Sequence, residues 1–479
     1  MAGRMEQLTT ISNDLTTPKP VVQEKLGSSF GSGHWLQRVR QSRAGAALGS
    51  FPSRVFLLAL AFYVTLTCLH LWVFGMPSSP QTAPGSFPLA DWASDFTTTW
   101  RRFDAFFFLQ IAHRGYTNQG LGAFFPLYPL LIRLFSWPLF GHFTLAALLV
   151  SWLCAWGSYL WFYCLAAREF GERVARWALL FLVLSPVSFF SFAPYSESLF
   201  LLVSIGAVER ARAGRLWQAS ALAALGMLTR PTGILLLIPL GWEWAQRAYQ
   251  AGLFPGWLKR YVPRWLFQAN APAEVAPKDA PRGAVGSTKP VDAGWDDGFS
   301  DRLAWLSLGL VPLALLGYMV FLRVRTGNAL AFLAGESAWH RHFTLPWDTA
   351  GLFGIAFQSS WQVGDMTAVI GNVVDLLLVI PLPALVLYSA IRCKKLWLGA
   401  ALYQLALTLL LIAVPNVPGP HGQEVLLSTQ RFILPAFPVF LLLGQFGDKR
   451  PWLARALLIA SSAMLLLNTW NFLQNVFIA

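Results

Sequence analysis

Charged residues are scarce in this sequence: Asp, Glu, Lys and Arg make up 12% of its 479 positions. Soluble globular domains carry about twice that fraction, so the composition excludes an ordinary soluble domain. Hydrophobic residues make up 55%, and the 22 Trp and 37 Phe residues are typical of helices anchored at membrane interfaces. The composition therefore indicates an integral membrane protein.

Cysteine is scarce too, with residues only at positions 68, 154, 164 and 393. None has metal-ligand spacing, and no outward loop holds a pair for a disulfide. The sequence also lacks a P-loop, an HExxH motif, a Rossmann fingerprint and a DxD pair. We therefore expect no metal and no cofactor, and nucleotide-dependent chemistry is unsupported.

Long apolar runs predict the membrane spans, because a bilayer core of about 30 Å takes roughly 20 apolar residues in a helix. Runs that qualify or nearly qualify are 55–75, 143–167, 177–195, 303–322, 368–391, 396–414, 431–446 and 452–473. Three shorter runs, 198–208, 217–229 and 231–245, are typical of broken spans that line a cavity within the protein. The sequence predicts an all-α polytopic membrane protein with about 9–11 transmembrane helices.

Basic residues orient these spans, because Lys and Arg concentrate in cytoplasmic loops. The net charge of +13 is explained by such loops facing anionic lipid, so we expect no nucleic acid partner. Four regions follow: a disordered cytoplasmic tail at 1–54, an N-terminal transmembrane catalytic part at 55–245 with outward loop 76–142, a cytoplasmic linker at 246–302, and a C-terminal transmembrane part at 303–479 with outward loops 323–367 and 415–430. Outward loops are natural places for chemistry.

The first outward loop contains Asp104 in the first turn of a predicted surface helix, whose apolar residues recur at helical spacing. One interpretation is a capping carboxylate that meets the positive end of the helix dipole. Another is a general base that deprotonates a sugar hydroxyl while Arg101 and Arg102 hold phosphate. The two roles are compatible.

Three other ionisable residues lie at predicted outward membrane edges. Glu197 stands between two apolar runs, where an ionisable group is a functional candidate by default, although it could simply begin a helix. Arg230 separates two short helices and could bind an anion or snorkel to lipid headgroups. Arg431 opens a later span and could bind a lipid phosphate or simply mark the interface.

Four segments together resemble a known family, the GPI mannosyltransferases that add the second mannose (the PIG-V family) and their prokaryotic relatives. Residues 103–116, FDAFFFLQIAHRGY, resemble the family's WDAxxFLxIAxxGY; residues 123–130, AFFPLYPL, resemble AFFPxxPL; residues 195–200, YSESLF, resemble YSEALF; and residues 229–233, TRPTG, resemble RSNG. Their order and rough spacing also agree, over about 100–235. For 123–130 we expect a structural turn, because its prolines oppose a regular helix.

The resemblance implies a GT-C fold with its active site in the first outward loop and a polyprenyl-phosphate sugar donor, which is dolichyl phosphate mannose in eukaryotes. Asp104 falls on the position of the family's catalytic acidic residue. The sequence departs from the family at Phe103, which replaces Trp, and at Pro231 and Thr232, which replace Ser-Asn. A GPI acceptor does not follow, because relatives without GPI anchors share these motifs.

We therefore expect an inverting glycosyltransferase, in particular a mannosyltransferase, that moves a sugar from a polyprenyl- or dolichyl-phosphate donor to a glycan or glycolipid on the non-cytoplasmic side. The expected site comprises catalytic Asp104 and Glu197, donor-phosphate ligands Arg102, Arg230 and Arg431, and substrate contacts Arg101, His113, Tyr195, Trp339 and Gln430. The expected partners are the lipid-linked donor, the acceptor and membrane lipids, in the plasma membrane of a prokaryote or the endoplasmic reticulum of a eukaryote. The alternative is a transporter or lipid flippase, which would concentrate ionisable groups near mid-membrane in two related halves.

Overall fold

The computed structural model describes residues 49–75, 96–255, 260, 303–337, 341, 343–391, 396–416, 425–426, 429–432 and 434–476. The chain divides into two units, Met1–Gly49 and Ser50–Ala479, and the first lies outside the described residues apart from Gly49. Most of the predicted tail, positions 76–95 of the first outward loop, most of the linker at 246–302, and Trp339 also lie outside them.

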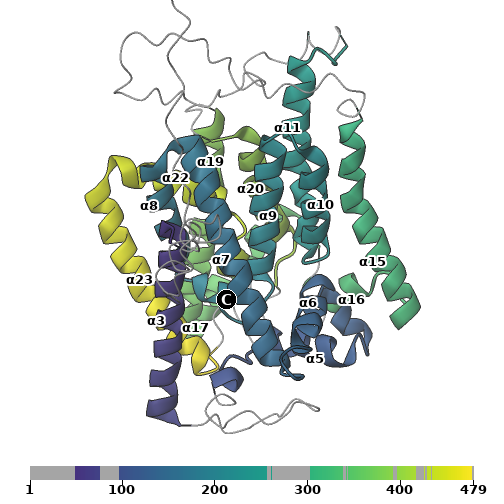
Figure 1. Cartoon of the computed structure of the whole chain (residues 1–479). Helices are drawn as coiled ribbons and strands as arrows, with labels where there is room; N and C mark the ends of the chain where they lie inside the picture. Colours follow the sequence, from purple (N-terminus) through teal and green to yellow (C-terminus); the bar gives the residue numbers. More distant parts are fainter. Residues whose placement is uncertain are drawn as a thin grey trace, which may run out of the picture. The chain divides into compact units, whose positions relative to one another are not determined.

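Helices build the described part of the second unit, as Figure 1 shows. In chain order they are α3 Phe51–Phe74, α5 Asp104–Arg114, η1 Gln119–Ala123, α6 Leu127–Ser136, α7 Phe143–Phe170, α8 Glu172–Val183, η2 Ser188–Ser191, α9 Glu197–Arg212, α10 Leu216–Met227, η3 Pro231–Leu236, α11 Leu237–Gln250, η4 Ala304–Gly309, α15 Leu310–Thr326, α16 Ala331–Ser337, α17 Pro346–Val363, α18 Met366–Val379, α19 Pro381–Ile391, α20 Leu398–Ala413, α21 Thr429–Phe432, α22 Pro438–Lys449 and α23 Pro451–Leu473. Extended pairing in these ranges is limited to an isolated bridge between Arg341 and Asn416.

Five helical stretches of the described chain are long and apolar enough to cross a membrane. They are Phe51–Phe74, Phe143–Phe170, Ala304–Thr326, Ala368–Ile391 and Pro451–Leu473. Three shorter apolar helices, α6, α10 and α20, accompany them. The predicted class, an all-α polytopic membrane protein, is confirmed; the count of 9–11 spans and the GT-C fold stay predictions.

Prolines divide three of the predicted spans. The run 177–195 stops being α-helical at Val183, shortly before Pro186, and resumes only as η2. The run 368–391 is split into α18 and α19 at Pro381, and the run 431–446 holds the end of α21 and, from Pro438, most of α22. Proline lacks an N–H and disfavours helix at the residue before it, whereas hydropathy alone does not register either effect.

Small residues allow the central helices to approach closely. Gly206 of α9 lies against Trp161 of α7, where an added Cβ would lie only 2.1 Å from the indole ring. Gly444 of α22 meets Ala178 of α8, and a Cβ there would lie 2.7 Å from the alanine Cβ. Small residues at helix contacts are the usual means by which membrane helices pack, since lipid supplies no hydrophobic drive between them.

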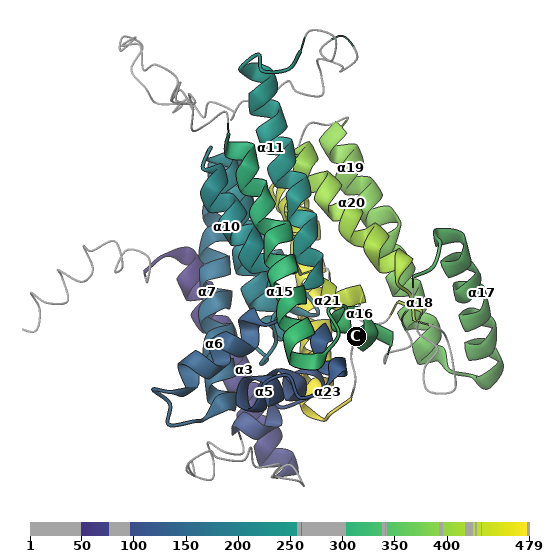
Figure 2. The same cartoon turned by 90° about the vertical axis from the view of Figure 1, so that its right-hand side faces the viewer.

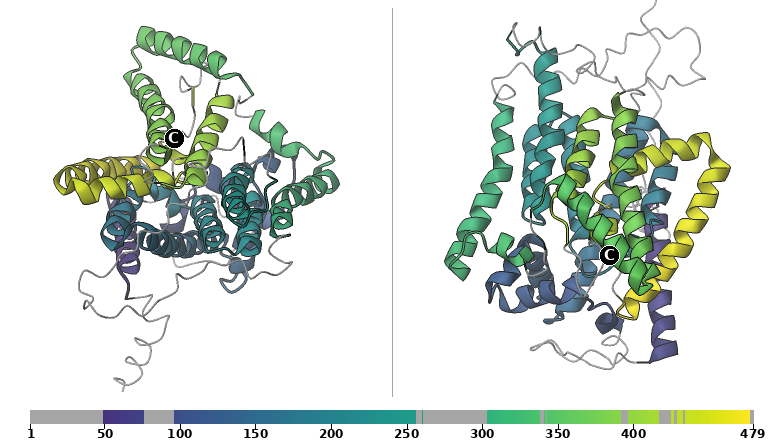
Figure 3. Two further views of the ribbon diagram at one scale, coloured as in Figure 1. Left: turned by 90° about the horizontal axis from the view of Figure 1, so that it is seen from above. Right: turned by 180° about the vertical axis from the view of Figure 1, so that it is seen from behind.

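The α17–α18 pair lies at the margin of the second unit in the views of Figures 2 and 3. It forms a small hydrophobic cluster of its own, distinct from the large cluster that unites most other helices. We call this the second core; its buried members are Phe353, Ala356, Val379, Val425 and Leu426. Val425 and Leu426 closely precede α21 in the sequence, so the second core supports the start of that short helix.

Candidate active site

The turn that precedes α5 is anchored on α3. The buried indole of Trp100 donates a hydrogen bond to Thr67 of α3, at 3.2 Å. Phe103 then adopts φ of 49°, a conformation that a residue with a Cβ rarely takes and that costs about 1–3 kcal/mol. Its two neighbours consequently reach different elements: Arg102 donates to the carbonyl of Leu473 at the end of α23, whereas Asp104 pairs with α21.

Asp104 is the first residue of α5 and not its N-cap. Phe103 occupies the N-cap position, and no side-chain capping bond is made there. The capping interpretation is therefore wrong in its hydrogen bond, although a carboxylate in the first turn still meets the positive end of the helix dipole. The carboxylate is instead engaged in an ion pair.

Two carboxylates and two guanidinium groups converge from four separate parts of the chain. Nη1 of Arg431 lies 2.6 Å from Oδ2 of Asp104, and its Nε lies 2.7 Å from Oε1 of Glu197. The Nη2 atom of Arg230 lies 3.1 Å from the same glutamate oxygen. We call these four residues the carboxylate–arginine cluster. Its formal charges cancel, which is what makes their burial tolerable.

Exposure separates the two carboxylates. The side chain of Asp104 is 22% exposed, whereas that of Glu197 is 1% exposed. The buried Oε2 atom of Glu197 has no partner among the described residues. Asp104 is thus the carboxylate that a bound molecule can reach, and Glu197 lies behind it.

Aromatic rings enclose the arginines. The guanidinium of Arg431 stacks over Tyr195 at 5.5 Å and over Phe190 at 5.7 Å, and that of Arg230 stacks over Phe432 at 4.9 Å. The carboxylates of Glu197 and Asp104 balance the charge of Arg431 from within hydrogen-bond distance. The side chain therefore stays charged. The phenol of Tyr195 donates to the carbonyl of Arg102, at 3.0 Å. This bond connects the aromatic side chains around Arg431 to the turn at Phe103.

Close backbone packing sets the position of Arg230. Its N–H donates to the carbonyl of Gly226 at the end of α10, and η3 begins at the next residue, Pro231. At Gly233 an added Cβ would lie 2.4 Å from the backbone nitrogen of Met227. Glycine is therefore required at position 233, because any side chain would push η3 away from α10 and move the arginine with it.

The predicted turn at 123–130 is wrong in its second half, where the chain is already helical. α6 runs through Pro129, which lies in its first turn, where a missing N–H costs no helical hydrogen bond. The N–H of Leu127 donates to the carbonyl of Leu228, close to Arg230, at 2.9 Å. The phenol of Tyr128 also bonds to Ser151 of α7, at 2.8 Å. This segment thus braces the loop of the cluster arginine.

Several predicted substrate contacts lie elsewhere. Arg101 donates from Nε to the hydroxyl of Thr144, at 2.6 Å, and the ring of His113 packs edge-on against Phe143, at 5.1 Å. Both therefore contact the start of α7. The side chain of Gln430 lies outside the described part of the structure.

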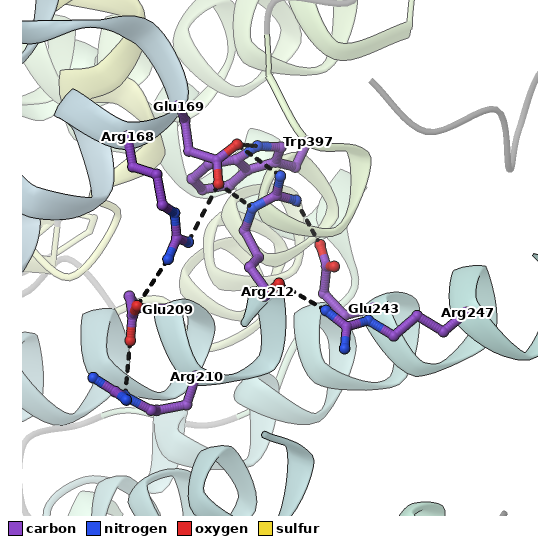
Figure 4. A network of polar contacts seen from close by, with 8 residues as sticks. All are labelled: Arg168, Glu169, Glu209, Arg210, Arg212, Glu243, Arg247 and Trp397. Carbon is purple, nitrogen blue, oxygen red and sulfur yellow. Dashed lines mark hydrogen bonds and ion pairs between the residues drawn. The ribbon is translucent and has the colours of Figure 1, made fainter. Parts of the chain in front are cut away.

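A second ion network joins the C-terminal ends of α7 and α9 to the middle of α11 (Figure 4). Arg212 lies 2.8 Å from Glu169 and 2.9 Å from Glu243, and its guanidinium stacks 4.1 Å from the ring of Trp397, which precedes α20. α9 continues to Arg212, beyond the predicted run 198–208, and its charged end is partly buried by partners from other helices. In the sequence, the adjacent residues Glu209 and Arg210 were the signal that could have indicated an ion network in this region.

Comparison with known proteins identifies relatives of one segment of the chain. Residues 54–257 match the family model described as Mannosyltransferase (PIG-V). We call these residues the PIG-V-like segment. The chain is similar to the human protein named GPI alpha-1,6-mannosyltransferase 2, with 32% identity over 172 residues, which cover 33% of this chain and 34% of the human protein. The rat protein of the same name is 33% identical over 144 residues, which cover 28% of this chain and 29% of the rat protein. The chain therefore matches only about a third of the length of these relatives. No solved structure matches.

The PIG-V-like segment contains three members of the cluster, Asp104, Glu197 and Arg230. The fourth, Arg431, lies outside it, more than 170 positions after its last residue. The resemblance inferred from the motifs is thus confirmed for the segment that carries the carboxylates. The arginine that bridges them comes from the part of the chain that the family model does not match.

Proposed function

We propose that this chain is an inverting mannosyltransferase that takes its sugar from a polyprenyl- or dolichyl-phosphate carrier. The acceptor is a hydroxyl of a glycan or glycolipid on the non-cytoplasmic side of the membrane. The observation that carries the proposal is the placement of Asp104: a partly exposed carboxylate, ion-paired through one oxygen to a partly buried arginine, within a segment that matches mannosyltransferases.

Asp104 acts as the general base in this proposal. Its ion pair with Arg431 engages Oδ2, so the other carboxylate oxygen can accept the proton of an acceptor hydroxyl. The acceptor oxygen then forms a bond to the anomeric carbon from the face opposite the phosphate. The bond from that carbon to the phosphate oxygen breaks, and its electron pair leaves with the lipid phosphate. One displacement inverts the anomeric configuration, and general-base catalysis of this kind contributes about 10²–10⁴ in rate.

Glu197, which the sequence predicts as catalytic, is better supported as a positioning residue. It is 1% exposed, and a single oxygen holds both Arg230 and Arg431. Through Arg431 it fixes the orientation of Asp104 without touching a substrate. Arginine groups can also stabilise charge that develops on a leaving phosphate without proton transfer.

The lipid-linked donor, the acceptor and membrane lipids are the partners in this proposal. The membrane is the endoplasmic reticulum if the source is eukaryotic and the plasma membrane if it is prokaryotic. The name of the human relative supports mannose as the sugar; for the acceptor we propose no more than a hydroxyl-bearing glycan or glycolipid.

Sugar transfer by membranes that contain the expressed chain tests the proposal. Radiolabelled polyprenyl-phosphate mannose should give a labelled glycan or glycolipid, and membranes with the Asp104→Asn variant should give little. The anomeric configuration of the product should be opposite to that of the donor. Absence of transfer from this donor, with transfer from a nucleotide sugar instead, would contradict the proposal.

A further inference from the structure

Two of the three arginines predicted to bind phosphate are already neutralised. Arg230 and Arg431 both pair with carboxylates of the cluster, so the cluster as a whole has no charge to attract an anion. Arg102 differs from them. Its described contact is to a neutral backbone carbonyl, that of Leu473, at 3.1 Å, and its buried Nε has no partner within the described ranges. It is a cation without a carboxylate in the part of the chain that the structure describes.

His70 is a second buried group with an unused polar atom. It is 6% exposed, its ring lies against Phe74 and Trp470 at 5.2 and 5.6 Å, and its Nδ1 has no partner in the described structure. A buried polar atom without a partner is costly, so such atoms call for an explanation. Of the seven histidines in the chain, it alone lies inside a predicted span, where an ionisable group is a functional candidate.

The fold brings these two groups together. Thr67, to which the indole of Trp100 is bonded, lies three residues before His70 on α3, so the two share a helix face. Arg102 follows Trp100 by two residues and donates to the carbonyl of Leu473, which lies three residues after Trp470, the residue whose ring packs against His70. An N–H of a guanidinium and an N–H of an imidazole are both hydrogen-bond donors suited to phosphate.

We propose that Arg102 and His70 form a pocket for the phosphate of an isoprenoid lipid, beside the carboxylate–arginine cluster and distinct from it. The proposed site adjoins α3 and α23, two helices that are in contact with each other and run side by side in Figure 1. Both helices expose apolar side chains outward, among them Trp72 of α3 and Leu467 of α23, so the lipid tail can remain in the bilayer. As a donor site this pocket rests on the proposed function; as a binding site it does not.

In this proposal, the two residues on either side of Phe103 have different roles. Arg102 holds the phosphate on one side of Phe103, and Asp104 receives the acceptor proton on the other. The unfavourable φ of Phe103 is what directs adjacent residues to different elements. The competing explanation is that Arg102 only satisfies the carbonyl of Leu473 at the end of α23, which is a purely structural contact.

Binding of radiolabelled polyprenyl phosphate to the purified full-length protein in nanodiscs separates these explanations. Arg102→Gln should weaken binding about 10- to 100-fold, because hydrogen bonds to charged groups are worth that much. His70→Gln should weaken it about tenfold. Arg133→Gln and His142→Gln, which change outward-loop residues with no described side-chain contact to the site, should bind as wild type. Normal binding by both pocket variants would overturn the proposal.

Folding of each variant is checked by size-exclusion chromatography and thermal unfolding. If Arg102→Gln does not fold, Arg102→Lys keeps the charge without the planar fork and should bind with intermediate affinity. Wild-type affinity in Arg102→Lys, together with wild-type affinity in His70→Gln, would equally overturn the pocket.

Competition identifies the source of the phosphate. Inorganic phosphate at millimolar concentration should compete in the wild-type protein and lose that effect in both pocket variants. Phosphatidylglycerol in the nanodisc should not displace polyprenyl phosphate; displacement at equal mole fraction would mark a general anionic-lipid site and overturn the proposal. Binding without mannose transfer would count against the proposed function alone, whereas transfer with normal binding in Arg102→Gln would count against the pocket alone.

Discussion

Arg431 and Asp104 form an ion pair of 2.6 Å although 327 positions separate them in the sequence. The same guanidinium lies 2.7 Å from Glu197. The bridge joins the PIG-V-like segment to a short helix far outside it. The candidate site is therefore completed by the C-terminal part of the chain and is not contained in the matched segment.

Asp104→Asn should lower the rate of mannose transfer by about 10²–10⁴ without reducing the amount of folded protein. Asparagine keeps the shape of the side chain and can still accept a hydrogen bond from Arg431, but it is not a base. Asp348→Asn is the matched control, since Asp348 is an exposed aspartate in the first turn of α17. Initial rates at matched protein amounts decide the outcome. A variant rate near that of the control would assign the base to another group.

Glu197→Gln should destabilise the protein by about 3–5 kcal/mol, because it leaves a buried arginine without its counter-charge. Arg431 keeps Asp104, but Arg230 loses the carboxylate with which it pairs. Thermal unfolding in detergent measures the effect. Glu172→Gln is the comparison, since the side chain of Glu172 is 70% exposed in its ion pair with Arg176. Loss of that exposed pair should cost less than about 1 kcal/mol. Equal unfolding temperatures for Glu197→Gln and Glu172→Gln would contradict a structural role for Glu197.

Gly233→Ala should destabilise the protein and lower activity, because its Cβ would lie 2.4 Å from the backbone of Met227. The backbone of α10 cannot yield as a flexible side chain could. Gly241→Ala in α11 is the control, since no atom lies within 4 Å of a Cβ there, and alanine in a helix interior should stabilise by about 0.5–1 kcal/mol. Opposite shifts of the unfolding temperature are expected, and a stabilised Gly233→Ala variant would contradict the packing.

Arg212→Lys should lower thermal stability while leaving the KM for the lipid-linked donor unchanged. Lysine retains the charge but cannot hold Glu169 and Glu243 together while lying flat on Trp397. Melting temperature and donor KM, measured on the same preparation, separate this structural arginine from Arg102. A raised KM with an unchanged melting temperature would place the second network in substrate binding.

Local motifs predict which residues matter better than they predict how those residues meet. Asp104, Glu197 and Arg230 each stand in a short recognisable segment, and the structure brings the three together. Arg431 carries only a weak local signal, and its pairing with Asp104 spans 327 positions of the sequence. Such pairing depends on which loops fold against one another, and periodicity does not encode it.

Span boundaries fail for a different physical reason. Hydropathy averages over proline, so it overlooks the breaks near Pro186 and Pro438. It also ends an apolar run at the first charged residues, whereas α9 continues to Arg212, which is partly buried by partners from other helices. In each case the missing information is the tertiary partner or the lost backbone hydrogen bond.

The second core has a consequence for how firmly the cluster is held. It contains few buried side chains, and a small cluster opens locally at a lower free energy than the main body unfolds. Arg431 follows Leu426 of this cluster by five residues. Amide protons of α17 and α18 should therefore exchange with solvent faster than those of α7, and each local opening should release the guanidinium from Asp104 for a moment.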